Sequence, residues 1–245
     1  MISAIIFDVF GTIAHIGRRT NPYRELVREG RRQGLTRTSE IMQLAMTTNE
    51  PLETLASKAG ISLTLSKRQE LSLALETELS SIRPYPDAME AMTTLRRAGL
   101  KIALCSNLAY PYGPVVKRLF PDVTAYAFSY ELGCLKPDPV VYQSACNQMA
   151  VRPGHCFDDG VGKVLMIGDS IKCDRDGPRA AGILGLHLER GPQGRIRDLV
   201  QFARLVLDPE QTQGEQWRNE NQQAIAAYNN HVAANGLFGD GLKRF

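Results

Sequence analysis

Short apolar runs alternate with amphipathic segments along most of the chain. Runs of apolar and β-branched residues predict buried strands over residues 4–7, 101–105, 126–128, 164–167 and 183–188. Between them, apolar positions at helical spacing predict helices over residues 88–98, 115–120 and 139–149. Strands and helices that alternate in this way are typical of a parallel sheet covered by helices on both faces. The pattern therefore predicts a doubly wound α/β fold.

A longer helical stretch separates the first strand from the others. Between the first two predicted strands, apolar positions recur at helical spacing until the alternation resumes at Pro84. We expect a core of residues 1–14 and 84–207, with an all-helical cap of residues 15–83 inserted into it. The remaining residues, 208–245, are rich in Gln and Asn and are expected to form a separate tail that contains a helix.

Composition narrows the class of protein. The chain has 245 residues, of which 43% are hydrophobic and 22% charged, as in an ordinary globular protein. A formal charge of +3 is too small to indicate nucleic-acid binding. The 5 cysteines are odd in number and show no Cys-x-x-Cys spacing, which argues against a zinc site or a disulfide framework. Because there is no basic leader and no apolar run of membrane-spanning length, we expect a soluble cytoplasmic protein without a membrane partner.

Polar side chains stand at the ends of the predicted strands, where open α/β sheets bind their ligands. They are Asp8 after the first strand, Ser106 and Asn107 after the second, and Asp169 after the fourth, with Asp174 five residues later. Lys136 precedes a predicted helix in the stretch Lys-Pro-Asp-Pro. Taken singly, Asp8 could cap a turn and Lys136 could be a solvated loop lysine. Together these residues predict a catalytic or metal-binding site at one edge of the sheet.

In this order, the four motifs resemble those of the haloacid dehalogenase superfamily with a helical cap inserted after the first motif, and the similarity covers residues 1–207. The resemblance implies that Asp8 attacks the substrate and forms a covalent aspartyl intermediate, which water then cleaves. It also implies that Ser106 hydrogen-bonds the transferred group and that Lys136 neutralises charge beside Asp8. The candidate catalytic residues are Asp8, Thr12, Ser106, Asn107 and Lys136.

The same resemblance implies a magnesium site. Its ligands would be Asp8, the backbone carbonyl of Phe10 and Asp169, with Asp174 in support. The chemistry agrees, because Mg²⁺ prefers a few carboxylates together with phosphate oxygens and water. Two converging carboxylates also need that cation, or Lys136, to remain ionised together.

Phe10 departs from the family's phosphatases. Their residue at this position is a second Asp, which protonates the leaving oxygen and then activates water. Loss of a positioned general acid costs about 10²–10⁴ in rate. A halide leaves without a proton, and the family's dehalogenases have an aromatic residue here. Phe10 therefore disfavours ordinary phosphomonoesters as substrates.

The last motif favours the opposite conclusion, because Gly-Asp-Ser at 168–170 with Asp174 resembles that of a phosphatase. The cap also lacks the Trp-Arg-x-Lys-Gln-Leu stretch expected of a dehalogenase. We prefer magnesium-dependent phosphoryl chemistry that is slow or restricted to good leaving groups. A catalytically weak or inactive scaffold with an antitoxin-like binding role and a 2-haloacid dehalogenase-type hydrolase are the alternatives.

A run of arginines opens the predicted cap. Arg18 and Arg19 lie close to the linker and are candidate contacts to a small anionic substrate. The arginines that follow, up to Arg32, alternate with Glu25 and Glu29 at short spacing. This spacing favours a solvated helix face that is paired with acidic neighbours.

The tail carries an apolar face on an otherwise polar segment. Trp217, Ile225, Tyr228 and Val232 fall on one side of a predicted helix. Residues 214–245 resemble the C-terminal, toxin-neutralising part of the CcdA antitoxin family, whose N-terminal DNA-binding part is missing here. The resemblance implies a CcdB-type toxin as partner. The candidate partner-binding residues are Trp217, Ile225, Tyr228, Val232 and Phe245, and the alternative is that this face packs on the chain's own globular part.

Overall fold

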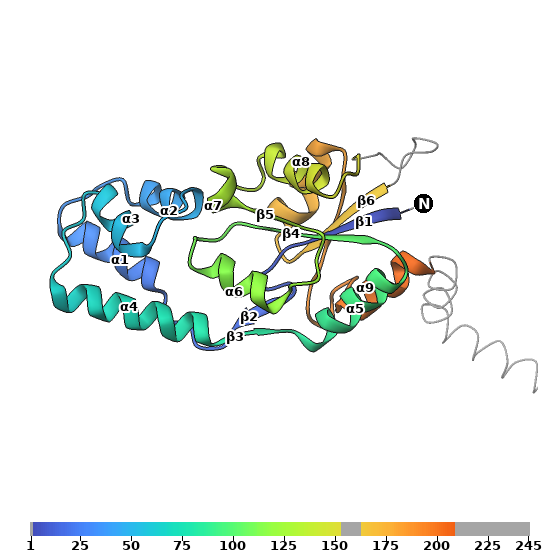
Figure 1. Cartoon of the computed structure of the whole chain (residues 1–245), viewed down its shortest axis with the longest axis horizontal. Helices are drawn as coiled ribbons and strands as arrows, with labels where there is room; N and C mark the ends of the chain where they lie inside the picture. The colour runs from blue at the N-terminus through green and yellow to red at the C-terminus, as the bar shows by residue number, and fades with distance from the viewer. Residues whose placement is uncertain (1, 153–162, 209–245) are drawn as a thin grey trace, which may run out of the picture. The chain divides into compact units, whose positions relative to one another are not determined.

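The computed structural model describes residues 2–152 and 163–208 (Figure 1). The chain divides into two compact units, residues 1–203 and residues 204–245. The predicted tail helix and its five candidate partner-binding residues lie outside the described residues. None of the described helices is long and apolar enough to cross a membrane.

A five-stranded parallel sheet forms the centre of the first unit. Its strands are β1 (Ile2–Phe7), β4 (Lys101–Ser106), β5 (Ala125–Phe128), β6 (Lys163–Gly168) and β7 (Leu184–His187). They lie in the order β5-β4-β1-β6-β7, and every neighbouring pair is parallel. The predicted α/β fold with a parallel sheet is confirmed.

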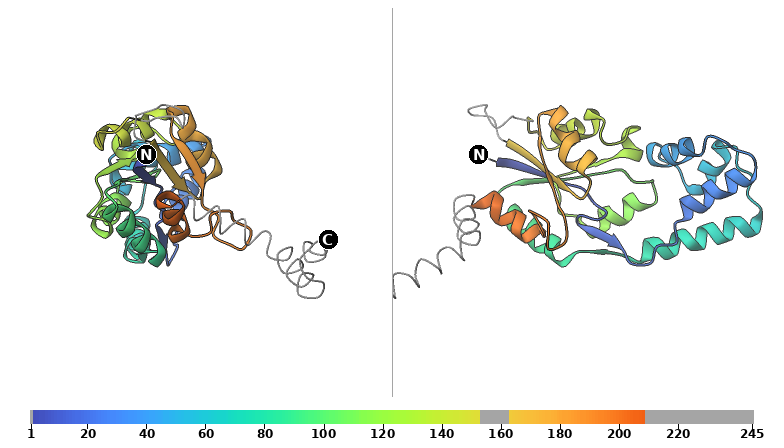
Figure 2. Two further views of the ribbon diagram at one scale, coloured as in Figure 1. Left: turned by 90° about the vertical axis from the view of Figure 1, so that its right-hand side faces the viewer. Right: turned by 180° about the vertical axis from the view of Figure 1, so that it is seen from behind.

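Helices cover both faces of this sheet, and β1 is buried between them. Residues 4–7 are fully buried, as expected for the middle strand of a parallel sheet. On one face, α8 (Pro139–Gln148) packs Val141 and Ala145 into a cluster with Ala4 and Ile6. α5 (Pro86–Arg97) lies over the other face, as the two views in Figure 2 show.

Several shorter elements complete the described part of the chain. α9 (Leu199–Leu207) places the Phe202 ring edge-on against Phe7, with ring centroids 5.9 Å apart. α6 (Tyr112–Leu119) and α7 (Ser129–Leu132) follow β4 and β5. A π-helical turn, η1 (Ile171–Asp176), and a 3₁₀ turn, η2 (Gly177–Ala181), connect β6 to β7.

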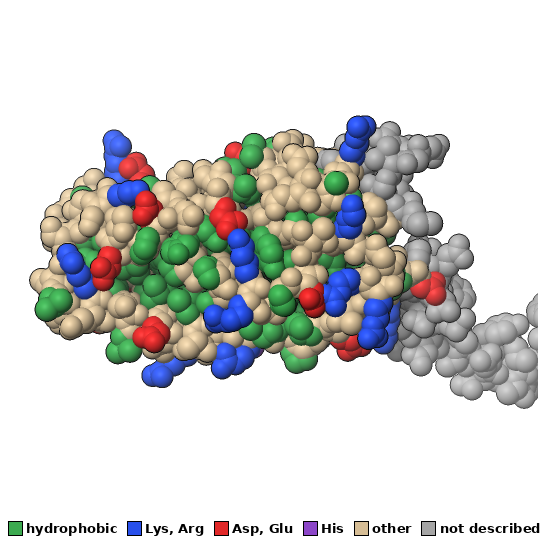
Figure 3. Space-filling model, in the orientation of Figure 1, with side chains coloured by type: hydrophobic (Ala, Val, Ile, Leu, Met, Phe, Trp, Pro, Cys, Tyr) green, Lys and Arg blue, Asp and Glu red, His purple; other side chains and the backbone are tan. Residues whose placement is uncertain are grey.

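Four helices are inserted after β1, and we call residues 22–80 the helical insertion. The helices are α1 (Pro22–Arg32), α2 (Thr38–Thr47), α3 (Leu52–Lys58) and α4 (Leu65–Ser80). The segments on either side of the insertion pair with each other as short antiparallel strands, β2 (Ala14–Ile16) and β3 (Ile82–Pro84). Strands of three residues are too short to show a sequence period, so this ribbon was not predicted. On the face drawn in Figure 3, hydrophobic side chains gather between α1 and α6. That the insertion acts as a cap stays a prediction.

Candidate active site

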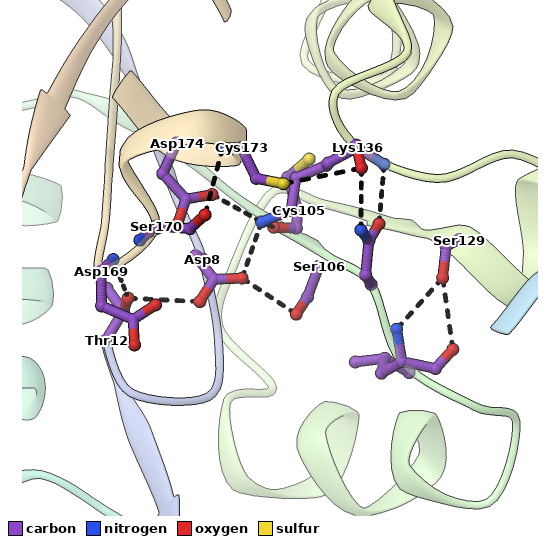
Figure 4. A network of polar contacts seen from close by, with 12 residues as sticks. Asp8, Thr12, Cys105, Ser106, Ser129, Lys136, Asp169, Ser170, Cys173 and Asp174 are labelled. Carbon is purple, nitrogen blue, oxygen red and sulfur yellow. Dashed lines mark hydrogen bonds and ion pairs between the residues drawn. The ribbon is translucent and has the colours of Figure 1, made fainter. Parts of the chain in front are cut away.

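Asp8 follows β1 directly, between the ends of β4 and β6. Its side chain is buried, with 6% of the residue exposed. One carboxylate oxygen, Oδ1, accepts hydrogen bonds from Ser106 Oγ at 3.0 Å and from Lys136 Nζ at 2.7 Å. The other, Oδ2, accepts from Thr12 Oγ1 at 3.2 Å (Figure 4). Three donors from three segments of the chain therefore hold this carboxylate in one orientation.

Lys136 lies in the middle of a buried ion cluster. Its ammonium group donates to Asp8 Oδ1 and Asp174 Oδ1, both at 2.7 Å, and to the Cys105 carbonyl at 3.0 Å. Burial by itself lowers the pKa of Lys136, but the charges of the two carboxylates outweigh it and raise the pKa above its ordinary value. The alternative of a solvated loop lysine is wrong, because only 5% of Lys136 is exposed.

The backbone around Lys136 is held on both sides. Asn107 accepts from the Lys136 amide at 2.7 Å and donates to its carbonyl at 3.0 Å, so its side chain contacts the backbone of Lys136. Asp138 caps α8 by accepting from the Val140 amide at 2.9 Å, and Pro139 begins the helix. The last two residues of the Lys-Pro-Asp-Pro stretch therefore begin α8. This helix start fixes the backbone position of Lys136.

Three carboxylates converge at this edge of the sheet. Asp8, Asp169 and Asp174 each offer an oxygen atom, and these atoms all lie within 4.8 Å of one another. Burial and the charge of Asp8 raise the pKa of both Asp169 and Asp174 above the ordinary range. Since three carboxylates face one ammonium group, the cluster has an excess of negative charge. Their hard oxygen atoms are the ligands that Mg²⁺ prefers.

Two glycines make room for these carboxylates. A Cβ atom on Gly11 would lie 2.1 Å from Asp169 Oδ2, and Gly11 also has φ +88°. A Cβ atom on Gly168 would lie 2.3 Å from Asp174 Oδ2. The clearance that each glycine provides depends on contacts between distant segments of the chain.

Replacing Gly11 with alanine should lower the free energy of unfolding by more than the same change at Gly99. Both glycines have a left-handed backbone, with φ +88° and +84°, so both variants carry the cost of a Cβ there, about 1–2 kcal/mol. Only Gly11 adds a clash with Asp169, because a Cβ atom on Gly99 meets nothing within 4 Å. Urea unfolding of the two variants measures the difference. Equal losses would contradict the close approach of Asp169.

The side chain and the backbone carbonyl of Phe10 have different surroundings. The ring packs edge-on against Tyr112, with centroids 5.8 Å apart. The neighbouring Val9 carbonyl accepts from three backbone amides. The Phe10 carbonyl receives no hydrogen bond from residues 2–152 or 163–208, which leaves this oxygen available to a metal ion. Phe10 has no group that can donate or accept a proton.

A cavity of about 270 Å³ lies between the helical insertion and the segments that follow Asp8 and Ser106. Helices of the insertion line one side of it, and Phe10, Asn107 and Tyr112 line the other. Arg19 contributes to the wall and is exposed. Arg18 is not among the described residues that line this cavity, and its backbone amide donates to Ser81 Oγ at 2.9 Å.

The arginines further along α1 pair on the helix surface. Arg28 pairs with Glu25, and Arg32 pairs with Glu29 at 2.8 Å. This arrangement agrees with a solvated helix face.

One arginine outside the predicted motifs braces the loop after Asp8. Arg190 donates to the Thr12 carbonyl at 2.7 Å and pairs with Asp87 at 2.9 Å. Its guanidinium carbon also lies 4.1 Å from the centroid of the Tyr85 ring. No sequence signal indicated this role, because these contacts join residues that are far apart in the chain.

Comparison with known proteins identifies two regions of similarity. Residues 2–182 match the family model described as haloacid dehalogenase-like hydrolase. Residues 203–245 match that of the post-segregation antitoxin CcdA. A haloacid dehalogenase-like phosphatase structure from Thermococcus onnurineus superposes with a TM-score of 0.56 and 19% identity, over 84% of this chain and 98% of that one. This superposition concerns the fold alone.

Curated relatives include both phosphatases and a dehalogenase. A glyceraldehyde 3-phosphate phosphatase of Methanopyrus kandleri is 28% identical over 122 residues, 47% of this chain and about half (48%) of that enzyme. A phosphatase of Mycobacterium tuberculosis is 27% identical over 226 residues, 84% of this chain and 97% of that one. An (S)-2-haloacid dehalogenase of a Pseudomonas species is 26% identical over 181 residues, 64% of this chain and 75% of that one. Because the first family model spans residues 2–182, most of the chain, this protein belongs to the haloacid dehalogenase-like hydrolase family.

Proposed function

We propose that this protein is a magnesium-dependent hydrolase that transfers a phosphoryl group from a small anionic substrate to Asp8 and then to water. The observation that carries the proposal is the buried Asp8 carboxylate, held by Ser106 and Lys136, with an oxygen of Asp169 within 4.8 Å. The phosphatases among the relatives support it.

In the first step an oxygen of Asp8 attacks phosphorus, and the bond from phosphorus to the leaving oxygen breaks. In the second step water attacks phosphorus, which releases phosphate and regenerates the carboxylate. Ser106 and Lys136 both reach Asp8 Oδ1, so both stand where the oxygens of the transferred group would arrive. The permanent positive charge of Lys136 would oppose the negative charge on those oxygens.

Asp8, Asp169 and the Phe10 carbonyl would hold the magnesium ion. The excess of carboxylates over ammonium groups and the unbonded Phe10 oxygen both suit a hard divalent cation. Asp174 would support the site without binding the ion directly, because its two oxygens already accept hydrogen bonds from Lys136 Nζ and from the Ser170 amide. When bound, the ion would supply positive charge for the phosphate oxygens.

The leaving group is limited by Phe10. Without a general acid at this position, the leaving oxygen must depart unprotonated, which favours aryl and acyl phosphates over alkyl phosphates. A metal-free 2-haloacid dehalogenase remains the alternative, supported by the dehalogenase relative and by the aromatic Phe10. Asp169 argues against it, because a third carboxylate beside Asp8 opposes an anionic substrate unless a cation is present.

Calorimetric titration with Mg²⁺ tests this proposal. We expect heat of binding for the wild-type protein and for Asp176→Ala, and none for Asp169→Ala. Asp176 is the matched control, because it is an exposed aspartate of η1 that pairs with Arg175. Equal heats for all three proteins, or no heat for any, would contradict a magnesium site at Asp8 and Asp169.

We also propose, from the match of residues 203–245 to the CcdA model, that the tail binds a CcdB-type toxin. This function is compatible with hydrolysis, because it uses a different part of the chain. Toxin binding by the tail also does not require an active catalytic site.

The double change Trp217→Ala and Tyr228→Ala should weaken toxin binding by about two decades or more. Burial of each large aromatic side chain contributes about 1.5–3 kcal/mol, and every 1.4 kcal/mol is a factor of about ten in affinity. A pull-down with a CcdB-type toxin measures the loss, with Asp8→Asn as the control that keeps binding. Retention of the toxin by the double variant, with loss by Asp8→Asn, would contradict a tail-borne interface.

A further inference from the structure

Tyr23, which lines the cavity, has a buried hydroxyl group. Tyr23 begins the inward face of α1, and only 7% of it is exposed. Its hydroxyl is buried and makes no hydrogen bond within the part of the chain that the structure describes. A buried hydroxyl left unpaired is destabilising, and Tyr23 is one of the residues that line the cavity.

A buried carboxylate lies on the same cavity wall. Glu78 of α4 is 4% exposed and accepts a hydrogen bond from the Tyr112 hydroxyl at 2.7 Å. Burial, together with this bond and the negative charge of Glu78, raises the pKa of Tyr112 above its usual range, so Tyr112 stays a neutral donor. No lysine, arginine or histidine among the described residues forms an ion pair with Glu78. A buried carboxylate without a cation is costly, in contrast to the carboxylates beside Lys136.

The remaining walls suit an aromatic body. Phe10 and Tyr23 both pack against the Tyr112 ring, with centroids 5.8 and 6.2 Å away. Met42 and Met46 of α2 add flexible apolar surface. A cavity of about 270 Å³ can hold one substituted ring.

Two residues of the cavity wall come from the segments that carry Asp8 and Ser106. Phe10 and Asn107, which line it, follow Asp8 and Ser106 within two residues. Arg19 and Arg24 also line it, but both are exposed and neither pairs with Glu78. A substrate with its phosphoryl group at Asp8 would extend its other end between the tyrosines toward Glu78.

We propose that this cavity binds an aromatic leaving group that carries an ammonium group, so that the substrate class is an amine-bearing aryl phosphate. This inference rests on the proposed function for its phosphoryl group, but the cavity and its two polar groups are independent of it. The ammonium group would pair with Glu78 and donate to the Tyr23 hydroxyl. A phenolate is also a leaving group that departs without the general acid that Phe10 replaces.

Two matched esters test the ammonium group directly. Tyramine phosphate and 4-propylphenyl phosphate have similar phenolic leaving groups and nearly equal size, and differ in one terminal ammonium or methyl group. We expect kcat/KM to favour tyramine phosphate by about ten- to a hundredfold, the range of a hydrogen bond to a charged group. Glu78→Gln should abolish this preference, whereas Glu76→Gln, which removes an exposed charge from the same helix, should keep it. Hydrolysis of both esters at the same rate by the wild-type protein, or a preference that survives Glu78→Gln, would overturn the proposal.

Tyramine itself separates this inference from the proposed hydrolysis. If no phosphate ester is hydrolysed, calorimetry with tyramine should still show binding that Glu78→Gln weakens by about ten- to a hundredfold. In that case the cavity inference would stand and the hydrolase proposal would fall. Tyr23→Phe should raise the melting temperature of the free protein, because it removes an unpaired hydroxyl, and should reduce the further rise caused by tyramine. Absence of tyramine binding to the wild-type protein would overturn the inference whatever the catalytic result.

Discussion

Replacing Phe10 with aspartate should raise the turnover of alkyl phosphates by about 10²–10⁴-fold, the usual contribution of a positioned general acid. The rest of the proposed site is already assembled, because Asp8, Ser106 and Lys136 are joined by hydrogen bonds of 2.7 and 3.0 Å. Hydrolysis of acetyl phosphate should change far less, since its leaving group needs no proton. Phosphate release from both substrates, in the presence of Mg²⁺, measures the two effects.

Phe10→Leu is the control for this prediction. It removes the edge-on contact with Tyr112 as aspartate does, but supplies no proton donor. If the leucine variant accelerates alkyl-phosphate hydrolysis as much as the aspartate variant, the gain comes from a wider cavity. If wild type is the fastest of the three, the absence of a general acid at position 10 does not limit hydrolysis of alkyl phosphates.

The change Asp8→Asn should abolish hydrolysis, with a loss on the order of 10⁶, as expected when a catalytic nucleophile is removed. Asparagine keeps the shape of the side chain but cannot form the covalent intermediate. Lys136 keeps Asp174 as its partner, so the variant should remain folded. Phosphate release and circular dichroism of the variant measure activity and folding separately.

A single turnover in ¹⁸O-labelled water distinguishes the two chemistries that Asp8 supports. Water that attacks phosphorus places the label in the released phosphate. An alkyl ester from a haloacid is instead cleaved at the carboxyl carbon, which places the label in Asp8. Label in Asp8 after reaction with a 2-haloacid, without metal, would replace the phosphatase proposal with dehalogenation.

The catalytic candidates were predictable because each stands at a feature with a local sequence signal. Asp8 and Asp169 follow buried strands and Ser106 ends one, and the side chains at strand ends of a parallel sheet meet at one edge. Lys136 stands before a helix start with its own capping residue, Asp138. Local pattern was sufficient to find these residues, although Lys136 and Asp8 are 128 positions apart.

The sequence predicted the residues of the acidic cluster but not their arrangement. The sequence indicated that Asp8 and Asp169 end two strands, but not that those strands are neighbours in the order β4-β1-β6. It also did not show that the space for Asp169 depends on the missing side chain of Gly11. The order of the strands and the close approach of Gly11 to Asp169 depend on how whole layers pack. This packing produces no periodic pattern in the sequence of either segment.

The alternation of apolar runs and helical segments was enough to establish the α/β class, because burial on a strand or helix imposes a local period. The same pattern located the helical insertion, since helical spacing persists between β1 and β4. The cavity was decided by tertiary structure alone. Tyr23, Glu78 and Tyr112 come from α1, α4 and the start of α6, and none stood out in the sequence. Which side chains share a cavity depends on how three helices are oriented against one another, and that orientation is set by long-range packing that no single segment records.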